Sequence, residues 1–111
     1  MAYDEDLAAR IRKLVADHAG VTETRMFGGL AFLVNGNMAV AASGQGGLLV
    51  RVDPTESSQL VETTPATEME MRGRTMAGWL RVASPDVEAN DALTAWVDRG
   101  VAFAGALPAK R

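Results

Sequence analysis

Arginines at strand-like positions are the residues of this sequence best suited to binding chemistry, and a tryptophan accompanies them. An arginine fork can bind a carboxylate or a phosphate through two hydrogen bonds, and protein interfaces are enriched in Trp and Arg. The simpler interpretation, which we favour, is that each arginine pairs with Glu23, Asp53, Glu68 or Glu70 on a neighbouring strand. The candidate interaction surface consists of Arg25, Arg51, Arg72, Arg74, Trp79 and Arg81.

Residues for catalysis or metal binding are scarce. His18 is the only histidine and there is no cysteine, so the usual His and Cys ligand sets of a zinc site are absent. We expect His18 to be structural, in the last turn of a helix where an imidazolium interacts well with the dipole. No motif supports a serine nucleophile. The glycine-rich stretch 44–47 lies between two strands and lacks the lysine of a phosphate loop, so we interpret it as a turn. We therefore expect no enzyme, no cofactor and no metal.

Size and charge narrow the class of protein further. The chain has 111 residues and a net charge of −3, which suits one domain over residues 1–111 and disfavours direct binding to a nucleic-acid backbone. Its first residues are acidic and no apolar run approaches the roughly 20 residues that span a bilayer. We expect a soluble cytoplasmic protein without a membrane segment.

Apolar periodicity predicts three helices. The first covers 4–19, with Asp4 as its cap and an apolar face that includes Leu14 and His18. A second begins after Asp53-Pro54, where proline suits the first helical position and Glu56 completes a capping-box pattern, and it ends near 63. The last begins with Asn90 as cap and carries Trp96 in its apolar stripe. Its Gly100 indicates close packing.

Alternation and turn residues predict the strands. We expect one long strand over 21–34, kinked or bulged at Gly28-Gly29, with two separate strands as the alternative. Asn35-Gly36 is typical of a tight hairpin turn, and further strands follow at 38–43, 48–52, 68–72 and 77–82. Strand 68–72 has an edge-like charge pattern, and its Met69 and Met71 are expected to fill the core. The predicted fold class is α+β, in the order α-β-β-β-α-β-β-α, with an antiparallel sheet and helices packed mainly on one face.

Several of these segments together resemble the N-terminal domain of the TfoX/Sxy competence-regulator family. The resemblance covers essentially the whole chain and implies this fold, frequently as a homodimer. Named members regulate DNA-uptake competence and carry a C-terminal helical domain similar to helix-hairpin-helix DNA binders. This chain ends at Arg111 without such a segment, so direct DNA binding is disfavoured. The structural signature is Met26, Phe27, Gly28, Gly29, Asn35, Gly36 and Trp96, accompanied by the segments 49–53 and 76–79.

The function expected from these observations is a non-enzymatic regulatory or protein-interaction domain that forms a homodimer. Its contact surface would be the partly covered sheet face, with Trp79 exposed. One alternative is a nucleic-acid-associated transcriptional regulator that uses the arginine cluster. The other is a module for a small ligand or anion, with the glycine-containing strand as a pocket wall.

Overall fold

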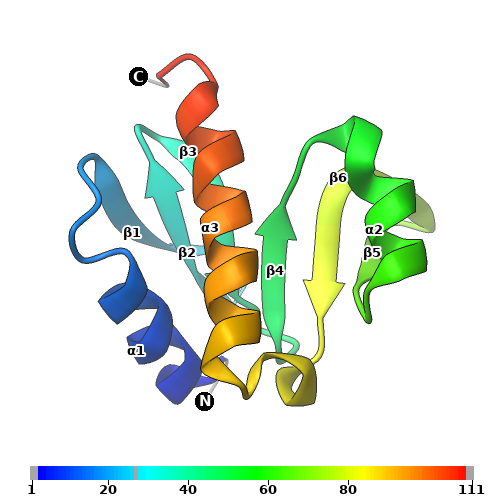
Figure 1. The fold of residues 1–111 in the computed structure, drawn as a ribbon, viewed down its shortest axis with the longest axis horizontal. Helices are drawn as coiled ribbons and strands as arrows, with labels where there is room; N and C mark the ends of the chain where they lie inside the picture. Colours follow the sequence, from blue (N-terminus) through cyan, green and yellow to red (C-terminus); the bar gives the residue numbers. More distant parts are fainter. Residues whose placement is uncertain (1–2, 27, 110–111) are drawn as a thin grey trace.

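The computed structural model describes residues 3–26 and 28–109 (Figure 1). Within them, one antiparallel sheet has the strand order β1-β2-β3-β4-β6-β5 and is flanked by α-helices. The elements confirm the α+β class, with one strand more than predicted before the second helix. In chain order they are α1 (Glu5–Leu14), β1 (Val21–Met26), β2 (Gly29–Val34), β3 (Asn37–Ala42), β4 (Leu48–Arg51), η1 (Pro54–Glu56), α2 (Ser57–Thr63), β5 (Thr67–Met71), β6 (Arg74–Val82), η2 (Ser84–Val87) and α3 (Asn90–Ala106).

The additional strand arises at the glycine pair, where the single long strand was the wrong interpretation and the two-strand alternative is correct. β1 and β2 form an antiparallel hairpin in which Met26 pairs with Gly29. Gly28 has φ +78°, a value that a residue with a side chain rarely adopts, so the chain reverses here. Phe27 lies outside the described residues. The second turn is as predicted, since Asn35 and Gly36 both have positive φ, 52° and 85°.

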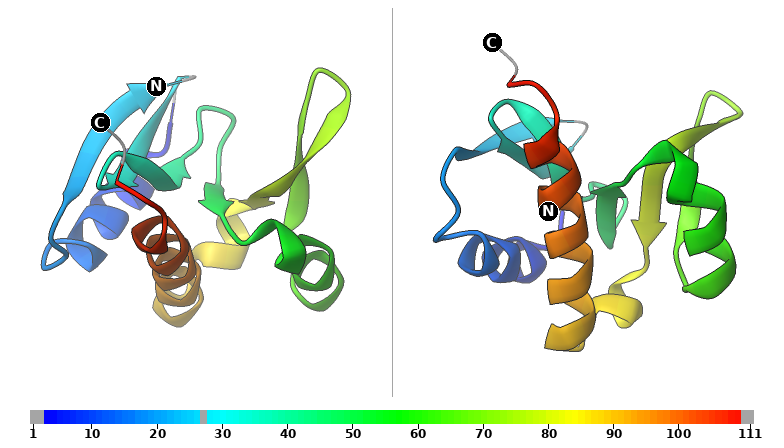
Figure 2. Two further views of the ribbon diagram at one scale, coloured as in Figure 1. Left: turned by 90° about the horizontal axis from the view of Figure 1, so that it is seen from above. Right: turned by 45° about the horizontal axis from the view of Figure 1, so that its top comes forward.

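The core lies between the sheet and the two longer helices. α1 and α3 cover the same sheet face (Figures 1 and 2), and α2 lies beside β5 and β6. Gly100 confirms the predicted close packing of the last helix, because a Cβ there would lie 2.6 Å from the carbonyl oxygen of Ala39. The largest fully buried side chains are Phe32, Ile11, Leu48, Leu80, Leu93, Val40, Val50, Val52, Val82, Val87 and Val97.

Three details of the helices differ from the sequence expectations. α1 keeps the predicted Asp4 cap but ends at Leu14. Leu14 is 40% exposed and His18 lies beyond the helix and is exposed, so neither belongs to the buried face that was predicted. Ala89, and not Asn90, is the N-cap of α3, because the Asn90 side-chain oxygen accepts a hydrogen bond from Arg10 instead. Glu56 does not complete a capping box, since its carboxylate binds Arg99 at 3.2 Å.

In the part of the chain that the structure describes, no helix has both the length and the apolar character needed to cross a bilayer.

Candidate interaction site

The sheet face away from α1 and α3 is concave, and we call it the concave face. Seen from above in Figure 2, the β1–β2 hairpin and the β5–β6 hairpin rise on opposite sides of β3 and β4. Between them lies a cleft of about 320 Å³, a volume at the lower end of the range for small-molecule sites. The cleft is lined by Met26, Gly29, Met38, Ala41, Ala42, Ser43, Gly44, Gln45, Leu49, Met69, Glu70, Arg72 and Arg81.

A bend in β6 brings the β5–β6 hairpin over this face. Gly78 has φ +87°, and the register between β5 and β6 shifts, so that Glu68 opposes Leu80 while Met69 opposes Met76. A Cβ on Gly78 would lie 3.1 Å from both the Val52 carbonyl oxygen and the ring of Pro54. Only glycine fits this conformation and this space without displacement. The outer half of the hairpin therefore stands away from the plane of the sheet as one wall of the cleft.

Arg81 is the charged group at the floor of the cleft. It is half-buried, and one guanidinium nitrogen donates to the Ser43 hydroxyl at 3.0 Å. The same hydroxyl accepts from the backbone N–H of Gln45 at 3.1 Å. A guanidinium carries five N–H donors, and Arg81 forms no salt bridge to any carboxylate that the structure describes. The cleft thus presents a fixed cation with spare donors.

Arg51 and Trp79 also lie on the concave face, but their side chains contact each other. They oppose one another on β4 and β6, and the Arg51 guanidinium lies 5.1 Å from the centre of the Trp79 ring. It also lies 5.7 Å from the ring of Phe103 on α3, because β3 and β4 separate beyond their last pair, Val40 and Val50 (Figure 1). Arg51 therefore joins the concave face to a helix on the other side of the sheet through cation–π contacts.

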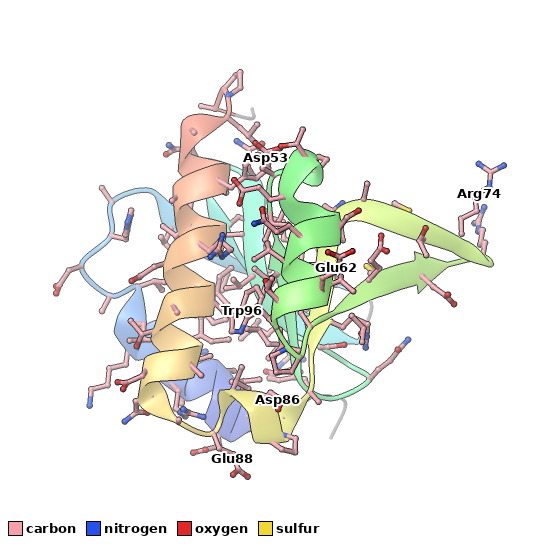
Figure 3. All side chains as sticks on the ribbon, turned by 45° about the vertical axis from the view of Figure 1, so that its right-hand side comes forward. Asp53, Glu62, Arg74, Asp86, Glu88 and Trp96 are labelled. Atoms are coloured by element: carbon pink, nitrogen blue, oxygen red, sulfur yellow. The ribbon has the colours of Figure 1, made fainter. Side chains whose placement is uncertain are left out.

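The remaining predicted arginines do not share one surface. Arg72 lines the cleft, whereas Arg74 stands at the tip of the β5–β6 hairpin (Figure 3). Arg25 opposes the core residue Leu30 and so projects from the helix-covered side of the edge strand. The structure brings together Arg72 with Arg81, and Arg51 with Trp79, and leaves Arg25 and Arg74 apart.

The favoured pairing of these arginines with acidic neighbours is wrong for the residues that the structure describes. The two salt bridges among these residues join Arg12 to Glu23 and Arg99 to Glu56, and neither involves an arginine on a strand. Arg12 on α1 holds Glu23 on β1 with two hydrogen bonds of 2.6 and 2.8 Å. These bonds lower the pKa of Glu23 below its ordinary value and raise that of Arg12.

Methionines are the cleft residues that sequence reasoning missed. Met69 was expected in the core, but Met26, Met38 and Met69 are only half-buried and line the cleft from three strands. The side chain of Met71 lies outside what the structure describes. Strand alternation places Met69 and Glu70 on opposite sides of β5, yet both line the cleft, and alternation alone could not show that the bent hairpin turns toward it.

A second hollow, of about 530 Å³, is larger but more open and lies between η1 and α3. Asp53, Glu56 and Asp98 give it an acidic rim beside Arg99. Hydrogen bonds from the backbone and then the hydroxyl of Thr55 lower the pKa of Asp53, so this carboxylate already serves as a cap. We regard the cleft on the concave face as the better candidate, because its Arg81 is half-buried and neither caps a helix nor forms a salt bridge with a described carboxylate.

The described residues contain no group of three or more His, Cys, Asp or Glu side chains placed to hold an ion.

Comparison with known families gives one match. The family model described as the TfoX N-terminal domain matches residues 13–104, which include every strand and nearly all of α3. No curated protein matches the chain.

Proposed function

Because the chain belongs to the TfoX N-terminal domain family, we propose that it is a regulatory domain that acts by binding and not by catalysis, and that two copies associate. The observation that carries self-association is the free outer edge of β1. We also propose a cytoplasmic location, since a chain without cysteine has no need of an oxidising compartment.

β1 is a fully formed strand that pairs on one side only. It lies at one end of the sheet, and its four central residues, 22–25, are exposed. An edge strand of this kind presents unpaired backbone donors and acceptors along its outer side. Another strand can bind them by extending the sheet, and a second β1 is the simplest partner because the contact is then symmetric.

The charges of β1 match those of a second copy. In an antiparallel pair centred on Thr24, Glu23 of one copy opposes Arg25 of the other on the same face, twice over by symmetry. Opposite charges across a strand pair stabilise it, and the central pair is Thr with Thr, which is also favourable. Glu23 keeps its bond to Arg12, because a carboxylate has acceptor sites for both guanidinium groups.

The other edge of the sheet lacks this complementarity. β5 reads Thr-Glu-Met-Glu-Met, and an antiparallel pair centred on Met69 would oppose Glu68 to Glu70 at both ends. Like charges directly opposite destabilise a strand pair. We therefore assign the dimer contact to β1 and leave β5 as a protected edge.

Charge reversal at β1 tests this assignment. Arg25→Glu and Glu23→Arg should each be monomeric in sedimentation equilibrium under conditions where the parent chain is a dimer, since like charges would meet at two positions. An equal mixture of the two variants should form a heterodimer, because both opposing pairs become Glu with Arg again. Arg74→Glu is the matched control, since it makes the same change at an exposed position away from β1, and it should remain dimeric.

Two outcomes would contradict the β1 contact. One is a parent chain that stays monomeric at every concentration. The other is a dimer that survives both charge reversals but dissociates in folded Trp79→Ala, which would place the contact on the concave face as the sequence first suggested.

A further inference from the structure

We propose that the cleft on the concave face binds a small organic monocarboxylate that carries a flexible apolar chain. This inference does not depend on self-association, since it rests on the cleft alone.

The charge of the cleft selects an anion. Its charged lining residues are Arg72, Arg81 and Glu70, so two cations face one carboxylate. Glu70 is exposed and makes no salt bridge with either arginine. A half-buried guanidinium is stabilised by an anion that completes its hydrogen bonds, and Arg81 is the one held in place, by Ser43 at 3.0 Å.

The polar groups around Arg81 suit the two oxygens of a carboxylate. The Ser43 hydroxyl accepts from Arg81 and from the Gln45 backbone, so its own hydrogen remains available to donate. A carboxylate beside Arg81 would accept from the guanidinium fork and from this hydroxyl. A single fixed arginine with one hydroxyl matches one carboxylate better than it matches a polyphosphate, which recruits several cations or a glycine-rich loop at a helix.

The walls of the cleft suit an apolar chain. Met26, Met38 and Met69 approach from β1, β3 and β5, with Leu49 on the floor. Unbranched, polarisable methionine side chains adapt to ligands of irregular shape, and a cleft of about 320 Å³ has room for a small molecule. The described lining residues include no aromatic ring, so a nucleobase would find no stacking partner among them.

Octanoate is the test ligand, because it joins one carboxylate to a short apolar chain. With the methionine methyl groups labelled for NMR, octanoate should shift the signals of the three methionines that line the cleft, Met26, Met38 and Met69, in a saturable manner. Octylamine and octanol, which have the same chain without the negative charge, should cause no saturable shift at matched concentrations.

Two variants test whether octanoate binding depends on the charge of Arg81. Arg81→Met keeps an unbranched side chain without the charge and should weaken octanoate binding roughly tenfold or more, the loss expected for a charge-assisted hydrogen bond. Arg74→Met, at the hairpin tip, should bind as the parent does. The proposal is overturned if octanoate shifts none of the three cleft methyl signals, if octanol shifts them equally, or if folded Arg81→Met binds octanoate as tightly as the parent.

Discussion

The backbone N–H of Gly78 donates a hydrogen bond of 2.6 Å to the hydroxyl of Ser57, and the bond is buried. This contact joins the start of α2 to the bend of β6, two segments that are 21 residues apart in the chain. The carbonyl oxygen of Gly78 in turn accepts from Val52. The bend that raises the β5–β6 hairpin is therefore held from both sides.

Removing the Ser57 hydroxyl should destabilise the fold. Ser57→Ala leaves the Gly78 N–H buried without a partner, which costs about 1–3 kcal/mol. Urea unfolding followed by circular dichroism measures the change. Ser58→Ala is the matched control, because Ser58 is exposed on the same helix, and it should stay within about 0.5 kcal/mol of the parent. Equal midpoints for the two variants would show that this hydrogen bond does not hold the bend.

The two glycines in the second half of α3 should respond to alanine with opposite signs. A Cβ on Gly100 would lie 2.6 Å from the Ala39 carbonyl oxygen and 2.8 Å from Val40, so Gly100→Ala should destabilise by about 1–3 kcal/mol through overpacking. At Gly105 the nearest atom would be a methyl of Val34 at 3.7 Å. There alanine should stabilise the helix by about 0.5–1 kcal/mol. Thermal melts of both variants check the prediction, and a stabilised Gly100→Ala would contradict the packing of α3 on β3.

Trp96 should contribute more to stability than any exposed residue of its helix. It is 8% exposed and belongs to the core, so Trp96→Ala should cost about 3–5 kcal/mol. Asp98→Ala, an exposed change two residues along α3, is the control and should alter the free energy of unfolding little. A Trp96→Ala variant that unfolds at the same urea concentration as the parent would mean that this face of α3 is not packed.

The bond between Arg12 and Glu23 should give a small acid-sensitive contribution to stability. The folded state lowers the pKa of Glu23, chiefly through the hydrogen bond from Arg12. Such a contribution is fully present above the unfolded pKa, about 4.3 for glutamate, and disappears as pH falls through the lower folded value. The difference in stability between the parent and Glu23→Gln should therefore shrink below about pH 4 and also in high salt, since both side chains are partly exposed.

A direct titration checks the cause of this shift. The side-chain carboxyl signal of Glu23, followed by NMR, should titrate at a higher pH in Arg12→Gln than in the parent. Lys13→Gln removes a neighbouring charge that does not bond to Glu23, whose partner is Arg12, and serves as the control. An unchanged Glu23 titration in Arg12→Gln would exclude the ion pair as the cause.

Local sequence patterns predicted most elements because each carries its own signal. The Asn35-Gly36 turn, the Asp4 cap and the buried alternation of Leu80 with Val82 depend on nearby residues alone. The β1–β2 hairpin was harder to predict, because the continuous apolar run lies on only one side of the glycine pair. The spacing of Gly28 and Gly29 fits either a bulge or a reversal.

The cleft could not be predicted because it depends on a bend that joins distant segments. Gly78 gave no turn signal of its own, since it lies inside a well-patterned strand, and its φ of +87° is tied to Ser57 and Val52 across the fold. Without that bend, Met69 and Arg72 would lie far from Ser43. Residue types alone therefore identified Arg72 and Arg81 as candidate binding groups but could not place the methionines beside them.

The bend at Gly78 also separates two kinds of evolutionary constraint within the β5–β6 hairpin. Residues 79–82 lie in the central sheet, where Leu80 and Val82 are almost completely buried, so their identities are restricted by the core. Residues 72–75 at the hairpin tip are exposed, and changes or insertions there would lengthen, shorten or recharge one wall of the cleft without repacking the interior. The size and charge of the cleft can thus vary through the tip of a single hairpin while the core stays the same.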